Sequence, residues 1–128
     1  VQDRFVVCSQ HASIDKELYL SAPHIGVSSR RSGLLLEDIY LKRNQLSRTL
    51  LLRCQHYSTA LQILAQHDTA MLTIPESILR HLHIDPKLHI FESPVDLPQI
   101  DLGMFWYKEM QENARHAFLR AEIFKIFT

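Results

Sequence analysis

Short apolar runs and amphipathic stretches alternate along the whole chain. Several of the short runs are apolar at nearly every position, as in Phe-Val-Val-Cys at 5–8. Strands of this kind are expected where helices cover both faces of a sheet. The pattern predicts strands at residues 5–8, 24–28, 50–54, 70–74, 88–91 and 102–107.

Helical spacing of apolar side chains occupies the stretches between these strands. Pro23 ends the first helix, because the residue before a proline is pushed out of the helical region. Pro75 suits the first turn of another helix, where its missing N–H has no cost. Pro94 and Pro98 keep residues 93–99 extended. We predict helices at 16–21, 34–43, from 57 or 58 to about 65, from 75 to about 82, and at 113–127.

Strands that alternate with helices over short connections indicate βαβ units. The fold class is therefore α/β, a mostly parallel sheet with helices on both faces. A chain of 128 residues is long enough for one domain that buries roughly two-thirds of its unfolded surface.

The charge balance argues against direct DNA binding by this segment. Lys and Arg together number 14, as do Asp and Glu, so the formal net charge is zero. A surface that grips nucleic acid usually has a basic surplus. We interpret Cys8 and Cys54, both within apolar runs, as reduced structural thiols. The sequence has no apolar run long enough to cross a membrane and no secretion signal at its start, so we expect a cytoplasmic protein.

Three stretches resemble a known family. They are SAPHIGVSSRRSG, then RTLLLRCQHYSTALQILAQHDTAMLTIPESI, then a Pro-containing link followed by MFWY and an amphipathic helix. Their order and spacing resemble the second half of the effector-binding domain of LysR-type bacterial transcription regulators. The chain departs from that pattern at His11-Ala12, where the family often has His-Pro.

The resemblance implies an architecture like that of periplasmic binding proteins, with two α/β subdomains around a cleft. Residues 1–13 would be a crossover strand and loop from a partial first subdomain. Residues 14–100 would form a nearly complete second subdomain, and residues 101–128 the return crossover strand and a helix of the first. The crossover strands themselves would lie at 4–9 and 103–107. The chain does not begin with Met, and we expect the rest of the first subdomain and a helix-turn-helix DNA-binding domain to precede it.

The predicted function is effector sensing and oligomerisation. A small molecule, often a carboxylate in that family, would bind in the cleft and alter DNA contacts made by the helix-turn-helix domain. We expect a homo-oligomer, dimer or tetramer, that contacts DNA only through that domain and does not contact a membrane. Phe118 and Phe124 lie on the last helix and need a covering surface, so we predict that this helix docks on another copy or exchanges with it.

Ligands of open α/β sheets bind beyond the carboxyl ends of the strands. Three such loops are candidate ligand sites, and the resemblance places all of them beside the cleft. Their candidate residues are Ser28, Ser29, Arg30, Gln55, His56, Tyr57, Thr73 and Pro75. Five of them have a structural alternative: Ser29 suits a turn cap, Arg30 a solvated loop, His56 and Tyr57 loop packing, and Pro75 a helix start. For Thr73 a structural role and a ligand contact are equally compatible with the sequence.

Other kinds of chemistry find little support. His81, His83 and His89 match no tight metal-ligand spacing. Ser28-Ser29 lacks the flanking glycines of a nucleophile elbow, and three glycines leave little for a phosphate loop. We therefore expect no enzymatic activity, no cofactor and no metal. The alternative function is that of a solute-binding protein of a transport system with the same architecture.

Overall fold

The computed structural model describes residues 1–127. The strands are β1 (Gln2–Asp3), β2 (Phe5–Ser9), β3 (Pro23–Val27), β4 (Thr49–Cys54), β5 (Met71–Pro75), β6 (His89–Glu92) and β7 (Ile100–Asp101). The helices are α1 (Lys16–Ser21), α2 (Leu36–Arg43), α3 (Tyr57–Leu64), α4 (Glu76–Leu79) and α5 (Ala114–Phe127), with a 3-10 turn at Lys108–Met110. Predicted and observed elements agree closely from Phe5 to Glu92, and the helix at 16–21 matches exactly.

The sheet is mixed. Its five strands lie in the order β4-β3-β5-β2-β6, and β3 pairs in parallel with both β4 and β5. In contrast, β2 is antiparallel to β5 and to β6. The α/β class is thus confirmed, and the antiparallel strand β2 lies between strands that all run the other way.

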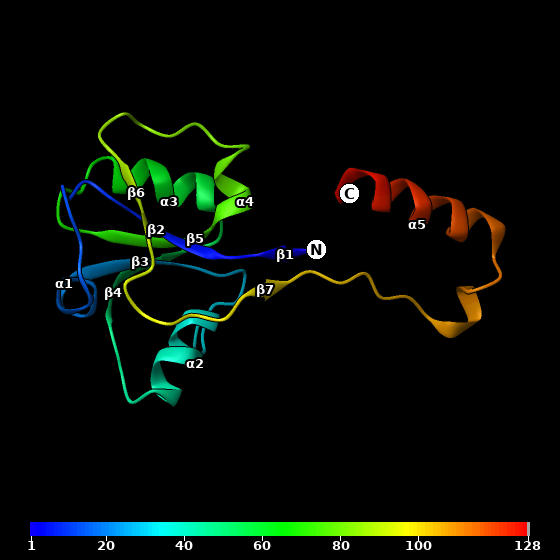
Figure 1. The fold of residues 1–128 in the computed structure, drawn as a ribbon, viewed down its shortest axis with the longest axis horizontal. Coiled ribbons are helices and arrows are strands. Elements are labelled where there is room, and N and C mark those ends of the chain that lie inside the picture. Colours follow the sequence, from blue (N-terminus) through cyan, green and yellow to red (C-terminus); the bar gives the residue numbers. More distant parts are fainter. Residues whose placement is uncertain (128) are drawn as a thin grey trace.

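Helices cover both faces of this sheet, as the continuous apolar strands predicted (Figure 1). On one face, Val6, Ile25 and Leu72 pack with residues of α3 and α4. On the other, Val7 and Met71 pack with Tyr19 of α1 and with residues of α2 and the 91–97 segment. Adjacent residues of β2 therefore enter opposite halves of the core, as strand geometry requires.

Two predictions about local structure are wrong. Residues 102–107 form no strand; they are extended but have no neighbouring strand to pair with, and Phe105 is 93% exposed. A short strand, β7, precedes this segment, and its Ile100 and Asp101 pair antiparallel with Asp3 and Gln2 of β1. The helix expected at 75–82 is shorter, because Pro75 still belongs to β5 and α4 ends at Leu79.

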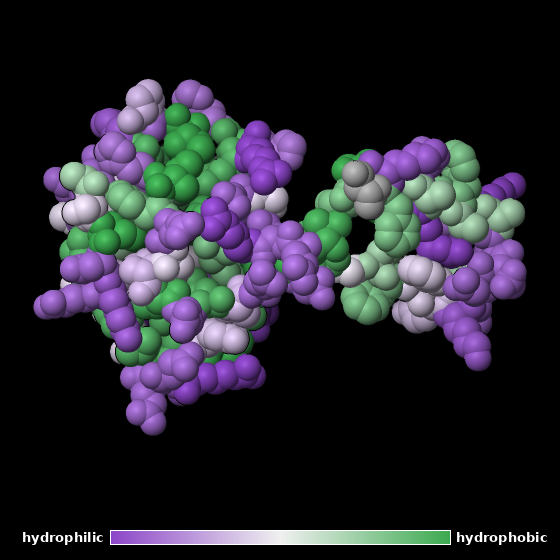
Figure 2. Space-filling model, viewed as in Figure 1, coloured by the Kyte–Doolittle hydropathy of each residue, from purple (hydrophilic) through white to green (hydrophobic). Residues whose placement is uncertain are grey.

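The segment from residue 102 to α5 projects from the sheet as a second lobe, which Figure 2 shows joined to the body through a narrow waist. Arg120 holds this lobe together. Its guanidinium lies 4.5 Å from the centre of the Trp106 ring and donates to the carbonyl oxygens of Met110 and Gln111, each over 3.1 Å. Many apolar side chains of the lobe remain exposed, among them Phe105, Tyr107, Phe118 and Ile126.

Candidate functional site at the carboxyl edge of the sheet

The carboxyl ends of β3, β4 and β5 meet at one edge of the sheet, because these strands are parallel neighbours. The loops that follow β3 and β4 are in contact there, since the Ser28 amide donates to the carbonyl oxygen of Cys54 over 2.9 Å. The antiparallel strand β2 begins at the same edge, where the Glu76 amide donates to the carbonyl oxygen of Arg4. All three predicted loops therefore arise from a single edge.

The loop after β3 is organised by its own hydrogen bonds. The Arg30 amide donates to Ser28 Oγ over 3.1 Å, and Arg30 Nη2 donates to the carbonyl oxygen of Leu34 over 2.8 Å. Ser29 and Arg30 are exposed. The Ser28 hydroxyl thus has the turn-forming contact that is common for serine, while Ser29 is open to solvent.

The loop after β4 presents Gln55 and His56, which are exposed. Tyr57, the first residue of α3, is half-buried and packs against the core beneath that helix. Burial raises the pKa of the Tyr57 hydroxyl above its ordinary value. Gln55 and His56 are therefore the accessible members of this predicted loop.

Thr73 and Pro75 occupy different surroundings. Thr73 is 2% exposed, and its Oγ1 lies 2.8 Å from the Tyr19 hydroxyl and 3.4 Å from Arg48 Nη1. Pro75 pairs with Phe5 and immediately precedes α4. Of the predicted residues, Thr73 lies inside the protein rather than on its rim.

A hollow of about 560 Å³ lies where this edge meets the second lobe. The segment that leads to the second lobe contributes residues 99 and 102 to its wall, and the N-terminal segment paired with it contributes residues 1–4. The start of α4 and the residues after it add 76–78, 80 and 81, and the end of α5 adds Ile126 and Phe127. Sequence reasoning located the edge but not these residues, which have no periodic or motif signal.

Charged groups on one wall of the hollow are already paired. Arg4 donates through Nε and Nη2 to the two carboxylate oxygens of Glu76, over 2.8 and 3.0 Å, and through Nη1 to Glu92 over 3.1 Å. Asp3 accepts from the Ser77 hydroxyl and amide. Burial acts to raise the pKa of Asp3, but these hydrogen bonds and the Arg4 amide outweigh it, so the pKa is lowered and the carboxylate stays charged.

Arg80 and His81 line the same hollow and are exposed. Within residues 1–127 neither side chain makes a hydrogen bond or an ion pair. The apolar part of the wall is supplied by Ile78, Leu102, Ile126 and Phe127. The hollow thus combines an apolar surface with two polar side chains, Arg80, whose charge also acts on the carboxylates of Asp3 and Glu76, and His81. Pockets for small organic molecules usually have this combination of apolar surface and a few polar groups.

A buried polar cluster, which sequence reasoning missed, lies beneath α2. The Arg48 side chain is fully buried, donates to both oxygens of Asp38, and lies 3.9 Å from Glu37. His24 lies 3.5 Å from Arg48 through Nδ1 and 2.5 Å from the Tyr19 carbonyl oxygen through Nε2. Because a carbonyl oxygen only accepts, the His24 proton is on Nε2, and Nδ1 accepts from Arg48.

Burial lowers the pKa of His24 to about 4, and the Arg48 charge acts in the same direction. Burial also raises the pKa of Glu37, against the opposing effect of Arg48. The cluster joins α1, α2, β3 and β5 near the amino ends of β3 and β4, and it therefore fixes α1 and α2 on this face of the sheet.

No cluster of metal-ligating side chains occurs within residues 1–127. No helix in that range is both apolar and long enough to cross a bilayer.

Comparison with known proteins points to one group. No family model matches the chain. It is 28% identical over 113 residues to the HTH-type transcriptional activator NahR of Pseudomonas putida, a LysR-type activator; the match covers 88% of this chain and 37% of NahR. The chain is thus a relative of the LysR-type transcription regulators.

Solved structures agree with this LysR-type relationship. The probable transcriptional regulator PA0477 of Pseudomonas aeruginosa is 26% identical with a TM-score of 0.68, over 77% of this chain and 35% of that one. The regulatory domain of MexT, a transcriptional activator of the same organism, has a TM-score of 0.74 at 15% identity and shows the shared fold, over 95% of this chain and 60% of that one. By name, NahR and MexT are transcriptional activators and PA0477 is a probable transcriptional regulator.

Proposed function

We propose that this chain is the effector-sensing part of a cytoplasmic LysR-type regulator, without enzymatic activity of its own. A small molecule binds in the hollow at the carboxyl edge and alters DNA binding by a helix-turn-helix domain elsewhere in the full protein. The observation that carries the proposal is the position of the hollow. Its wall includes the segment that leads to the second lobe and the N-terminal residues that pair with it, so a bound molecule would contact the parts that must move if the lobes change their arrangement.

The ligand that fits best is a small organic acid. The volume of about 560 Å³ lies within the range of small-molecule pockets. Arg80 supplies a guanidinium, which pairs well with a carboxylate, and the apolar side chains face the rest of the molecule. Ser29, Arg30, Gln55 and His56 remain proposed contacts along the same edge.

Binding regulates only if the ligand has unequal affinity for two arrangements of the protein. The body is fixed by its sheet and by the Arg48 cluster. The two lobes are joined by the short β1–β7 ladder, in which two residue pairs are in register. We infer that the ligand shifts the angle between the lobes, and that this angle is what the rest of the regulator senses.

Self-association is the second part of the proposed function. Phe105 is 93% and Phe118 68% exposed, and exposed apolar surface of this extent usually marks an interface. We propose that a second copy covers the lobe formed by residues 102–127. No observation favours the alternative of a transport protein, since the relatives described above are regulators.

The test is thermal denaturation of the chain with benzoate, and with benzamide as an uncharged control of similar shape. Benzoate at about 100 times its dissociation constant should stabilise the protein by about 2.7 kcal/mol. Arg80→Ala should abolish the stabilisation, whereas Arg43→Ala, at an exposed position on α2, should leave it unchanged. Arg30→Ala and His56→Ala test the loops that follow β3 and β4 in the same way. Equal stabilisation of the Arg80→Ala variant and the unmodified chain would exclude the hollow as the binding site.

A further inference from the structure

Arg53 is a half-buried cation whose hydrogen bonds are incomplete. It lies on β4, opposite Gly26 of β3, and its Nη1 donates to the carbonyl oxygen of Gly33 over 2.7 Å. Its Nε and Nη2 are also buried, and within residues 1–127 they have no hydrogen-bond partner. A charged donor buried without a partner is costly, so this group calls for an explanation.

A second guanidinium approaches the same place. Arg30 Nη2 donates to the carbonyl oxygen of Leu34, the residue next to the one that Arg53 contacts. Arg30 Nη1 lies 3.7 Å from the point where a Cβ on Gly33 would stand. Gly33 has a φ of +90°, a conformation that favours glycine, and the absence of a side chain leaves space beside the Arg30 guanidinium.

No carboxylate neutralises these two cations within residues 1–127, where the ion pairs involve Arg4, Arg48 and Lys125. Two like charges that converge on one loop repel each other unless an anion lies between them. The loop also bears the exposed hydroxyls of Ser29 and Ser32, which can donate to an anion.

We propose that Arg30, Arg53 and the 28–34 loop form a binding site for an oxyanion, the carboxylate or phosphate group of a small molecule. Guanidinium groups bind both kinds of oxyanion with two parallel hydrogen bonds. The free Nε–H and Nη2–H of Arg53 form such a pair of donors, and the Arg30 guanidinium would contact the anion from its opposite side. The anion would satisfy the two donors that the protein leaves unpaired.

Access to this site requires the loop to move, because Arg53 Nε and Nη2 are covered. Residues 29–34 are exposed, and the loop leads directly into α2. The first turn of α2 is fixed by the ion pair between Asp38 and Arg48. Anion binding would therefore reorganise the loop between two fixed points, the end of β3 and the first turn of α2.

None of these residues lines the hollow, but Arg30 is also one of the contacts proposed above. The variants that separate the two proposals are therefore Arg53→Lys for this site and Arg80→Ala for the hollow. The experiment uses the whole chain and replaces sodium chloride by sodium phosphate or by sodium acetate at constant ionic strength. The readout is the NMR signal of each arginine Nε–H. The Arg53 signal should move in a saturable way, and the Arg31 signal should not. A response to phosphate alone, to acetate alone or to both identifies which oxyanion the site accepts. No saturable movement with either anion would overturn the proposal.

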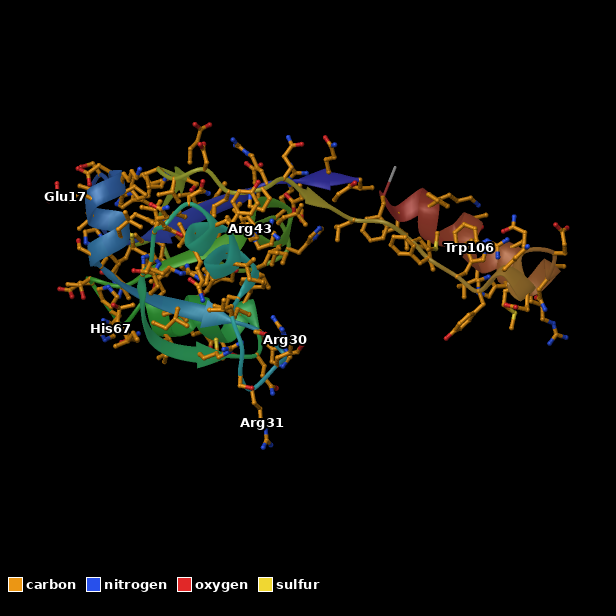
Figure 3. The ribbon with its side chains drawn as sticks, turned by 90° about the horizontal axis from the view of Figure 1, so that it is seen from below. Glu17, Arg30, Arg31, Arg43, His67 and Trp106 are labelled. Carbon is orange, nitrogen blue, oxygen red and sulfur yellow. The ribbon has the colours of Figure 1, made fainter. Side chains whose placement is uncertain are left out.

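Arg31 gives a matched control, because it extends from the tip of the same loop away from the body (Figure 3). Arg30→Ala and Arg53→Lys should each weaken anion binding about tenfold or more. Binding is measured from the rise in the thermal stability of the chain as the anion is added. Arg31→Ala removes the same charge and should have almost no effect. Equal weakening by Arg31→Ala would mean a general attraction of anions to the loop and would overturn the site. Arg30 is exposed, so its variant tests the proposal even if Arg53→Lys fails to fold.

Discussion

Arg48 donates from Nε to Asp38 Oδ1 over 2.7 Å, with the arginine side chain fully buried. Breaking such a pair leaves one buried charge without its partner. We expect Asp38→Ala to lower the free energy of unfolding by about 3 kcal/mol, measured by urea denaturation. The exposed pair of Arg4 and Glu92 is the control; Glu92→Gln should cost less than about 1 kcal/mol. Similar losses for both variants would contradict this account of the cluster.

The second prediction concerns acid. The pKa of His24 is about 4 in the folded protein, below the value of about 6.5 for an unfolded histidine. The unfolded state therefore takes up the proton first, and stability falls as the pH decreases from about 6.5 to about 4. The full loss from this group is about 3 kcal/mol.

The measurement is urea denaturation at a series of pH values, for the unmodified chain and for His24→Gln. Glutamine can donate to the Tyr19 carbonyl oxygen without taking up a proton. The raised pKa of Glu37 works in the opposite direction, since a folded state that holds its proton more tightly gains stability as the pH falls. Because Glu37 is present in both proteins, the difference between the two curves isolates His24. Parallel curves would show that His24 does not titrate as proposed.

The third prediction concerns close packing beneath the 28–35 loop. A Cβ at Gly26 would lie 2.6 Å from Leu35 Cδ1 and 3.3 Å from both terminal methyls of Leu50. Leu35 is buried, so it has little room to move. Gly26→Ala should cost about 1–3 kcal/mol by overpacking. Gly103→Ala meets only the exposed ring of Phe105 at 3.1 Å and should change stability by less than about 0.5 kcal/mol. Calorimetry that ranks the two variants equally would argue against this packing.

The fourth prediction concerns association through the second lobe. At micromolar concentration, light scattering should show a dimer or a larger species of the unmodified chain. Phe118→Glu places a charge on the exposed surface of α5 and should shift the chain toward the monomer. Leu36→Glu, at an exposed apolar position on α2, should leave the mass unchanged. A monodisperse monomer before any substitution would end the proposal that a second copy covers this lobe.

Sequence reasoning succeeded where local signals determine the structure. The strand at 5–8 and the helix at 16–21 follow from apolar runs and a nearby proline, and both are observed. It failed at 102–107, since an apolar run becomes a strand only where another strand accepts its hydrogen bonds. The length of α4 was also misjudged, because Ile78 and Leu82 have helical spacing although the helix ends at Leu79.

The candidate site was harder to predict. The carboxyl edge follows from strand order, and the loops at Ser28 and Gln55 are found there. Thr73 lies near the carboxyl end of an apolar strand, where a ligand contact was expected, yet its side chain points into the protein against Tyr19. Arg53 had a signal that could have been used, a charged residue inside an apolar strand. Arg80 and His81 line the hollow only because of tertiary packing.

The position of β2 limits where this chain can be cut. Although β2 is formed by residues 5–9, it lies between β5 and β6 and hydrogen-bonds to both. A shortened version that began at residue 14 would lose an internal strand and leave β6 without a neighbour. Any minimal version of the body made for crystallisation or NMR should therefore start no later than Arg4, however dispensable the first residues look in the sequence.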